Sequence, residues 1–281
     1  MKPGKELTVI TPRRRWLELR LADIWRYRDL VLLFARRDFV TVYKQTVLGP
    51  FWFVLQPLAS TAIFTVVFGY IVGVTTGEIP RALFYLSGVV LWNFFSSCLT
   101  RSSDTLVANA SLFGKVYFPR LTVPLSVGLV NSLTFLVQFV IFAGFAGYFA
   151  LQGAPLRISA QIWTLPLVVL QVGCLGLASG ILVSALTTKY RDLAFMTGFA
   201  VQLWMYATPI VYPLSLVPEG WRPVYLLNPM AVAVGSFRGL FWAGAAPPAF
   251  WIGVSWIETL LSLVLALVLF NWVEKTFVDT V

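Results

Sequence analysis

The sequence contains no histidine and has two cysteines among 281 residues. The lack of histidine excludes catalytic triads, proton relays and metal sites built on imidazole. Cys98 and Cys174 both lie inside apolar segments, so neither a disulfide framework nor a metal-ligand spacing is predicted. No metal site is therefore expected.

Charged residues are also scarce, at 12% of the chain, whereas hydrophobic residues make up 58%. Soluble domains contain about 25% charged residues. Apolar runs that are long enough to span the bilayer cross it as helices, because a helix satisfies its own backbone hydrogen bonds. The composition predicts an all-α polytopic membrane protein with one membrane domain.

The basic residues cluster at the start of the chain, where eleven of the 21 Lys and Arg residues precede Thr46. A basic flank beside a membrane span is typical of the cytoplasmic side, so the net charge of +9 does not predict nucleic-acid binding. Because the first 47 residues are polar and charged, we expect no cleavable signal peptide and interpret the first span as the insertion signal.

Residues 1–15 are expected to form an irregular arm, and residues 16–47 an amphipathic helix with its lead-in to the membrane. From Trp16 to Phe34 apolar residues recur at steps of three and four between charged ones. Such a helix suits the lipid headgroup layer or a soluble partner, and both interpretations can hold together.

About 20 apolar residues are needed per crossing, and this requirement predicts six spans within a permease domain at 48–274. They are placed at 51–74, 83–106, 122–150, 160–186, 192–213 and 250–273. With the N-terminus inside, the cytoplasmic side collects 17 basic residues and the outer side four, namely Arg81, Arg157, Arg222 and Arg238. This bias predicts that both termini, including a tail at 275–281, are cytoplasmic.

Two connections differ from simple loops. Residues 101–120 are too polar for membrane core, and Asn109 or Ser111 is a candidate N-cap of a short helix there, although a plain connector is the alternative. Residues 213–248 are apolar but broken by prolines and glycines, and Met230 to Trp242 would reach only about 20 Å as a helix. This outer segment is predicted to form short re-entrant helices before the last span.

Few residues offer chemistry inside the spans. No phosphate-binding glycine motif is present, so any ATP must be hydrolysed by a partner. Glu258 is a candidate functional carboxylate, although it lies close enough to the outer boundary to reach water. The scarcity of charge within the spans argues against an ion-coupled carrier.

Aromatic residues mixed with Gln, Asn and Ser form stripes on three predicted spans. Each stripe is either packing or an interfacial belt, or a lining on which sugar rings could slide. The candidate lining residues are Trp52, Phe53, Gln56, Ser60, Phe64 and Phe68 in the first span, Trp92 in the second, and Phe195, Phe199, Gln202 and Tyr206 in the fifth.

Several separated motifs resemble the membrane subunits of type-2 ATP-binding-cassette exporters, especially the permeases for O-antigen, capsule and teichoic-acid polymers. The resemblance covers essentially the whole chain. It is carried by Arg37-Asp38, Tyr43-Lys44-Gln45-Thr46, Leu48-Gly49, Trp52, Gln56-Pro57, Leu112-Phe113-Gly114-Lys115, Phe118-Pro119-Arg120, Tyr190-Arg191-Asp192, Thr208-Pro209-Ile210 and Leu227-Asn228-Pro229. Pro50 departs from the pattern, which has an ordinary apolar residue after the glycine.

The resemblance implies a homodimer in the bacterial inner membrane that works with two copies of a separate ATPase, which binds ATP and Mg, so that this chain itself needs no cofactor. It implies that spans one and five line the path and that the outer hairpin forms a periplasmic gate. The coupling residues to the ATPase would be Asn109, Ser111, Leu112, Phe113, Lys115 and Tyr117. A cytoplasmic mouth would comprise Arg37, Asp38, Tyr43, Lys44 and Gln45.

The sequence therefore favours a transport subunit, not an enzyme, that moves a lipid-linked polysaccharide such as O-antigen. One alternative is a permease for a small amphiphile, such as a drug or lipid. A further alternative is a lipid-modifying membrane enzyme, which the lack of histidine and the few acidic residues disfavour.

Overall fold

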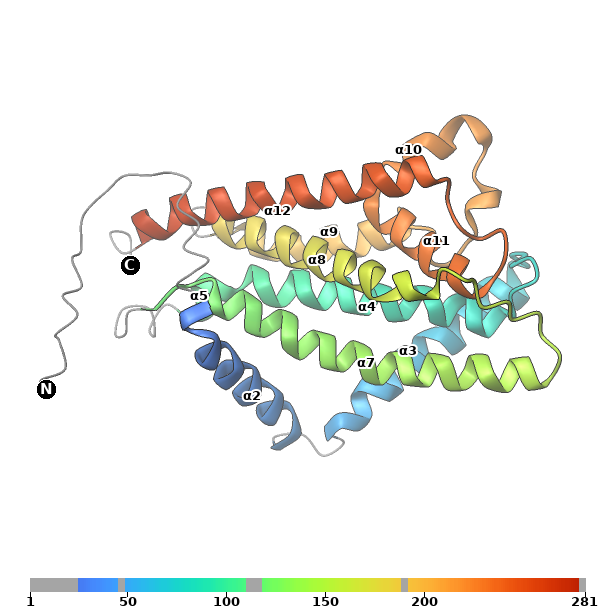
Figure 1. The fold of residues 1–281 in the computed structure, drawn as a ribbon, viewed down its shortest axis with the longest axis horizontal. Coiled ribbons are helices and arrows are strands. Elements are labelled where there is room, and N and C mark those ends of the chain that lie inside the picture. The colour runs from blue at the N-terminus through green and yellow to red at the C-terminus, as the bar shows by residue number, and fades with distance from the viewer. Residues whose placement is uncertain (1–24, 45–48, 110–117, 188–191, 278–281) are drawn as a thin grey trace, which may run out of the picture.

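The structure is a computed structural model that describes residues 25–44, 49–109, 118–187 and 192–277. The described residues are helical, with turns and loops between the helices and no β-strand. The long helices run side by side as a bundle (Figure 1). The helices are α2 (Arg28–Lys44), η1 (Gly49–Phe51), α3 (Trp52–Phe64), η2 (Thr65–Ile71), α4 (Arg81–Ser103), α5 (Thr105–Ala108), α7 (Thr122–Leu151), η3 (Ile162–Thr164), α8 (Leu165–Thr187), α9 (Asp192–Tyr206), η4 (Leu214–Leu216), η5 (Glu219–Trp221), α10 (Arg222–Leu226), α11 (Pro229–Phe241) and α12 (Ala249–Phe277).

Five helical segments are long and apolar enough to cross a membrane, and they coincide with five of the six predicted spans. They are Trp52–Ile71, Arg81–Ser103, Thr122–Leu151, Ile162–Thr187 and Ala249–Val273. The fold class predicted from the sequence is confirmed.

The predicted span at 192–213 differs from the structure, because its helix, α9, has 15 residues and ends at Tyr206. Residues 207–210 form a turn. Pro209 explains the end of the helix, since proline has no N–H to donate and restricts Thr208 before it to non-helical conformations. The sixth apolar segment by length is instead a bent pair, Glu219–Leu226 and Pro229–Phe241, with 100° between its halves. These are the short helices that the sequence predicted before the last span.

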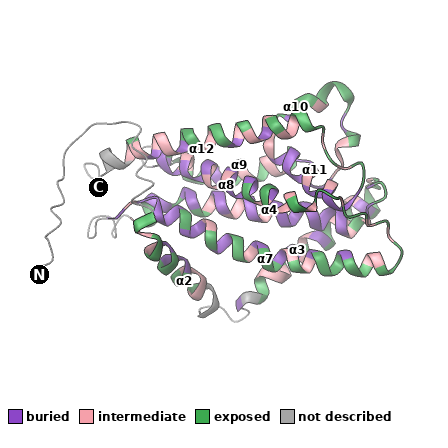
Figure 2. Ribbon diagram, in the orientation of Figure 1, coloured by how far each residue is buried: buried purple, intermediate pink, exposed green. Residues whose placement is uncertain are grey.

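Helix α4 is the centre of the bundle, with 78% of its apolar window buried, against 17% for the span that contains α3. It packs on α3, α7, α8 and α9, and Figure 2 shows it mostly buried. Gly176 and Gly180 of α8 permit the close approach to α4, because an added Cβ would lie 2.7 Å from the Phe95 carbonyl oxygen and 2.4 Å from that of Leu99. Small residues at such contacts let membrane helices pack closely.

The described part of the predicted amphipathic helix is α2, which runs on to Lys44. Val31 and Phe34 are buried on its inner face, whereas Leu32 and Leu33 are exposed on the other. Residues 16–24 lie outside the described part. Gly49 then turns the chain into the first span with φ +43°, a conformation that favours glycine, and Pro50 follows within the short helix η1.

Candidate functional site

Helix α9 packs on α4 and α8 but carries a wide exposed surface. Phe195 is 89% exposed and Phe199 62%, and Gln202 and Tyr206 are also exposed. Thr197 is the one buried residue of the helix. All four predicted lining residues of the fifth span therefore lie on a surface that no described part of the chain covers.

The predicted lining residues of the first span divide into two groups. Trp52 and Gln56 are exposed, and Phe53 and Ser60 are partly buried. Phe64 and Phe68 are also partly buried, with ring centroids 5.8 Å apart, and Phe64 lies 6.4 Å from Tyr85 of α4. Within one chain Phe64 therefore packs against α4, and both phenylalanines pack against the core of the bundle.

Trp92 of α4, the predicted lining residue of the second span, is buried and packs against Phe95 with 5.2 Å between ring centroids. In the single chain it belongs to the core. Since both α3 and α9 contact α4, the exposed residues of both helices flank the same central helix.

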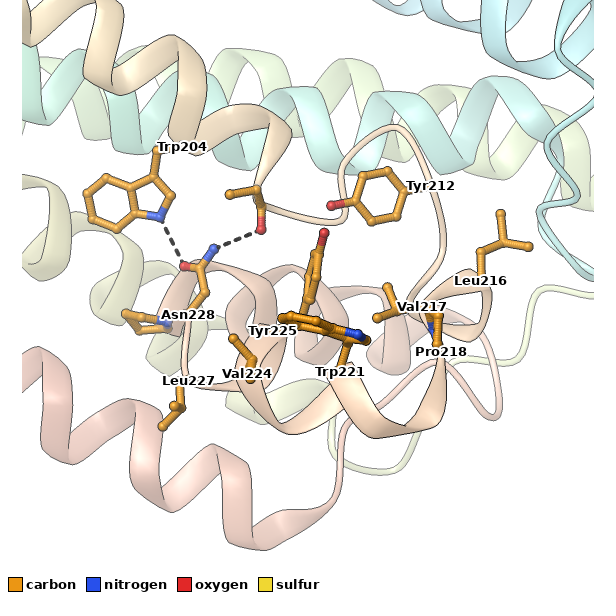
Figure 3. A pocket seen from close by; sticks show the side chains of 12 residues that line it. Trp204, Tyr212, Leu216, Val217, Pro218, Trp221, Val224, Tyr225, Leu227 and Asn228 are labelled. Carbon is orange, nitrogen blue, oxygen red and sulfur yellow. Dashed lines mark hydrogen bonds between the residues drawn. The ribbon is translucent and has the colours of Figure 1, made fainter.

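An aromatic pocket of about 860 Å³ lies beside the end of α9 and is lined by the segment that follows it (Figure 3). Tyr212 and Tyr225 meet there edge to face, with ring centroids 6.2 Å apart. Figure 3 shows Trp204 and Asn228 on one side of the lining and Leu216 and Pro218 on the other. The lining is Trp204, Ala207, Tyr212, Leu216, Val217, Pro218, Trp221, Val224, Tyr225, Leu227, Asn228 and Pro229.

Asn228 holds this pocket together through its amide group. Its Oδ1 accepts from Trp204 Nε1 at 3.1 Å and from the Met230 backbone N–H at 3.0 Å, which caps the start of α11. Its Nδ2 donates to Thr208 Oγ1 at 3.0 Å and to the Ala207 carbonyl at 3.3 Å. The bonds to Trp204 and to the Ala207 carbonyl are the dashed lines of Figure 3.

A polar cavity of about 480 Å³ lies at the other end of the bundle, where α5 is found (Figure 1). Arg37 and Asp38 of α2 line it, joined by a 2.8 Å ion pair. Arg101, Asp104 and Asn109 line it from α4 and the residues around α5. The structure therefore brings two predicted mouth residues together with one predicted coupling residue.

The predicted coupling segment is described at its two ends. Asn109 follows α5, and its Nδ2 donates to the Thr105 carbonyl at 3.0 Å. Phe118 is buried against Phe34 of α2, with ring centroids 5.6 Å apart. The side chains of Tyr43 and Lys44 lie outside the described residues, as do Gln45, Ser111, Leu112, Phe113, Lys115 and Tyr117.

A comparison with protein-family models matches residues 29–242 to the ABC-2 type transporter model. The chain belongs to the ABC-2 type transporter family. The match spans α2 through α11, so it includes both cavities and the exposed surface of α9.

Named relatives of this ABC-2 type transporter include the O-antigen export system permease protein RfbA of Klebsiella pneumoniae, which is 27% identical over 89% of this chain and 94% of that protein. The RfbA protein of Myxococcus xanthus is 25% identical over 92% of this chain and 94% of its own. The polysialic acid transport protein KpsM of Escherichia coli is 22% identical, with 87% of this chain and 93% of that protein covered.

Sequence reasoning missed two residues of the outer hairpin. Arg238 was counted among residues flanking the outer side, but it is buried in α11. A lone arginine within the apolar stretch from Met230 to Trp242 is the signal that could have found it. Asn228 was noted as part of a motif, and its N-cap position before Pro229 could have been read from the sequence. Its bonds to Trp204 and Thr208 could not.

Glu258 lies in α12, partly buried, and its Oε2 has no hydrogen-bond partner among the described residues. Its functional role stays a prediction.

Proposed function

We propose that this permease, a non-enzymatic subunit of an ABC exporter, forms a homodimer and moves a lipid-linked polysaccharide, such as O-antigen, across the bacterial inner membrane. The observation that carries the proposal is the exposed surface of α9, which presents the aromatic rings of Phe195, Phe199 and Tyr206 together with the amide of Gln202. Aromatic faces suit the apolar faces of sugar rings, and an amide suits their hydroxyl groups.

The same surface supports a second copy of the chain. An amide such as that of Gln202 is costly against lipid, because hydrocarbon offers no hydrogen-bond partner. If α9 and α3 of two copies face each other across an axis, Gln202 and Gln56 border an aqueous path. In this arrangement the exposed aromatic residues line the path, together with the predicted residues that pack against α4 in the single chain.

Coupling to an ATPase is supported by the contact between Phe34 and Phe118. This contact joins α2 to the end of the polar connection at 101–120, so a push on that connection reaches the helix that leads into the first span. We propose that Asn109, with the residues up to Tyr117, docks on the ATPase, and that Arg37 and Asp38, with Tyr43 to Gln45, form the cytoplasmic mouth.

The basic residues support the orientation. Eleven precede Thr46, which supports a cytoplasmic N-terminus and a cytoplasmic position for the cavity lined by Arg37. The aromatic pocket at the end of α9 is then periplasmic, as is the outer hairpin that helps to close the path. ATP and Mg are bound by two copies of the partner ATPase, and this chain needs no cofactor of its own.

Deletion of the gene, followed by complementation, tests the proposal. We expect surface polysaccharide to disappear and to return with the intact chain, and the purified permease to bring an ATPase with it. Unchanged surface polysaccharide would refute the choice of cargo. Absence of any stable complex with an ATPase would refute the exporter assignment itself.

A small amphiphile is the alternative cargo, and the largely apolar lining of the outer pocket favours it. Vesicles that contain the permease and its ATPase distinguish the two. Stimulation of ATP hydrolysis by a lipid-linked oligosaccharide, and not by detergents or lipophilic dyes, is expected for the polymer exporter. The reverse result would establish the alternative.

A further inference from the structure

Arg238 of α11 is buried, with 4% of its surface exposed, and it binds two separate parts of the bundle. Its Nε donates to Ser87 Oγ at 3.0 Å and its Nη2 to the Phe84 carbonyl at 3.0 Å, both in α4. Its Nη1 and Nη2 also donate to the Pro209 and Ile210 carbonyls, at 2.8 and 3.0 Å, in the turn that ends α9. The guanidinium carbon lies 3.6 Å from the centre of the Phe84 ring.

The turn that ends α9 needs these donors. Pro209 interrupts the helix, and Pro209 and Ile210 are buried, so their carbonyl groups would otherwise lack partners away from water. A buried carbonyl without a partner is strongly unfavourable, and irregular backbone at membrane depth is tolerated only where protein satisfies it. Arg238 therefore supplies what the broken helix lacks.

The contact requires an arginine and not simply a positive charge. Among the described residues no carboxylate forms an ion pair with Arg238, so carbonyl and hydroxyl oxygens and an aromatic face compensate its charge. The planar fork of a guanidinium reaches oxygens on several sides at once, whereas a lysine ammonium is a compact point charge with three donors.

Two neighbours complete the arrangement. Gly88 leaves room for it, because an added Cβ would lie 2.8 Å from Ile210 Cγ2 and 3.0 Å from Arg238 Nη2. Asn228, at the other end of α11, binds Ala207 and Thr208. Both ends of α11 are thus fixed to the four-residue turn 207–210, and one of them is fixed to α4 as well.

We propose that Arg238 is a positioning residue that joins α11, the turn 207–210 and the outer half of α4 into one rigid unit. The outer hairpin then moves together with α9 and does not swing as a separate lid on that turn. The role of this unit in transport rests on the proposed function, but its rigidity is a property of the fold and is measured independently of any cargo.

Hydrogen–deuterium exchange on the full-length permease, in nanodiscs and bound to its ATPase, tests the proposal. Ser87→Ala removes one bond to Arg238 and leaves the charge in place, and we expect exchange in 207–213 and 229–241 to rise about fivefold, as for the loss of one hydrogen bond. Arg238→Lys should raise exchange in both segments by about tenfold or more.

Matched controls lie nearby. Ser96→Ala removes a hydroxyl of α4 that donates to Asn93 in the same helix. Arg222→Met removes a hairpin arginine whose bonds go to Ser215, Val217 and Glu219, all within the hairpin. Both controls should leave exchange in 207–213 within about twofold of the parent, since neither removes a hydrogen bond to that segment.

Unchanged exchange in both segments of Ser87→Ala and Arg238→Lys would overturn the proposal. So would a rise in 207–213 without a rise in 229–241, because the two segments would then open independently. If Arg238→Lys does not accumulate, the Ser87→Ala result decides. Loss of polysaccharide export bears on the proposed function, whereas the exchange pattern bears on the rigid unit, so the two can fail separately.

Discussion

The contact between α4 and α8 gives a prediction in which the same chemical change has opposite effects at two sites. Gly180→Ala adds a methyl group that would lie 2.4 Å from the Leu99 carbonyl oxygen and 2.6 Å from Ser102 Cβ. Backbone cannot rotate away as a flexible side chain can, so α4 and α8 must separate. Gly144→Ala in α7 is the matched control, because an added Cβ there has no atom within 4 Å.

The magnitudes follow from two opposing terms. Replacing glycine by alanine inside a helix stabilises it by about 1 kcal/mol at either site. Overpacking of a filled interior costs about 1–3 kcal/mol and occasionally more, and this term applies only to Gly180. We therefore expect Gly144→Ala to be stabilising by about 1 kcal/mol and Gly180→Ala to be destabilising by about 0–2 kcal/mol, and by more where the overpacking cost exceeds that range.

Thermal unfolding of the purified permease in detergent, followed by size-exclusion chromatography, measures the difference. The midpoint for Gly180→Ala should fall below that of the parent, while the midpoint for Gly144→Ala should equal or exceed it. Equal midpoints for the two variants would show that α4 and α8 do not approach as closely as the structure has them, and the argument for the central packing would fail.

Three further predictions concern the candidate site. The double variant Phe195→Ala/Phe199→Ala should leave the midpoint of thermal unfolding nearly unchanged, because both side chains are exposed. It should lower surface polysaccharide severalfold on an immunoblot. Normal export would show that these two residues do not line the transport path. Asn228→Ala should destabilise the permease by about 2 kcal/mol, since it removes the cap of α11 and leaves the Trp204 N–H without its acceptor. Asn228→Asp keeps the cap and the acceptor, so its midpoint in thermal unfolding should fall less. Equal losses of stability in the two variants would contradict these roles of the Asn228 side-chain oxygen. Phe34→Ala should weaken co-purification of the ATPase severalfold through loss of the contact with Phe118. Leu33→Ala, on the exposed face of α2, should leave co-purification unchanged. Equal effects of the two variants would argue against coupling of the ATPase to the first span through α2.

The sequence alone determined the fold class and most of the spans. Hydrophobic length decides whether a helix can cross the membrane, and length is visible in one dimension, so five of the predicted spans coincide with helices of the structure. The outer short helices were also predictable, because prolines and glycines interrupt the apolar stretch that contains them. The four predicted lining residues of α9 could be placed on one face of the helix from helical periodicity.

The tertiary structure decided which residues meet. Thr208-Pro209-Ile210 and Leu227-Asn228-Pro229 were separate motifs in the sequence, and the structure shows Asn228 bound to Thr208, and Arg238 to Pro209 and Ile210. Phe64 and Phe68 pack against the core of the bundle and Trp92 packs against Phe95 within the single chain, and their place in the transport path stays a prediction. Periodicity gives the faces of a helix but not its rotation against its neighbours. That rotation follows from close packing between helices far apart in sequence, as at Gly180 and Leu99, and from buried carbonyls that require a donor.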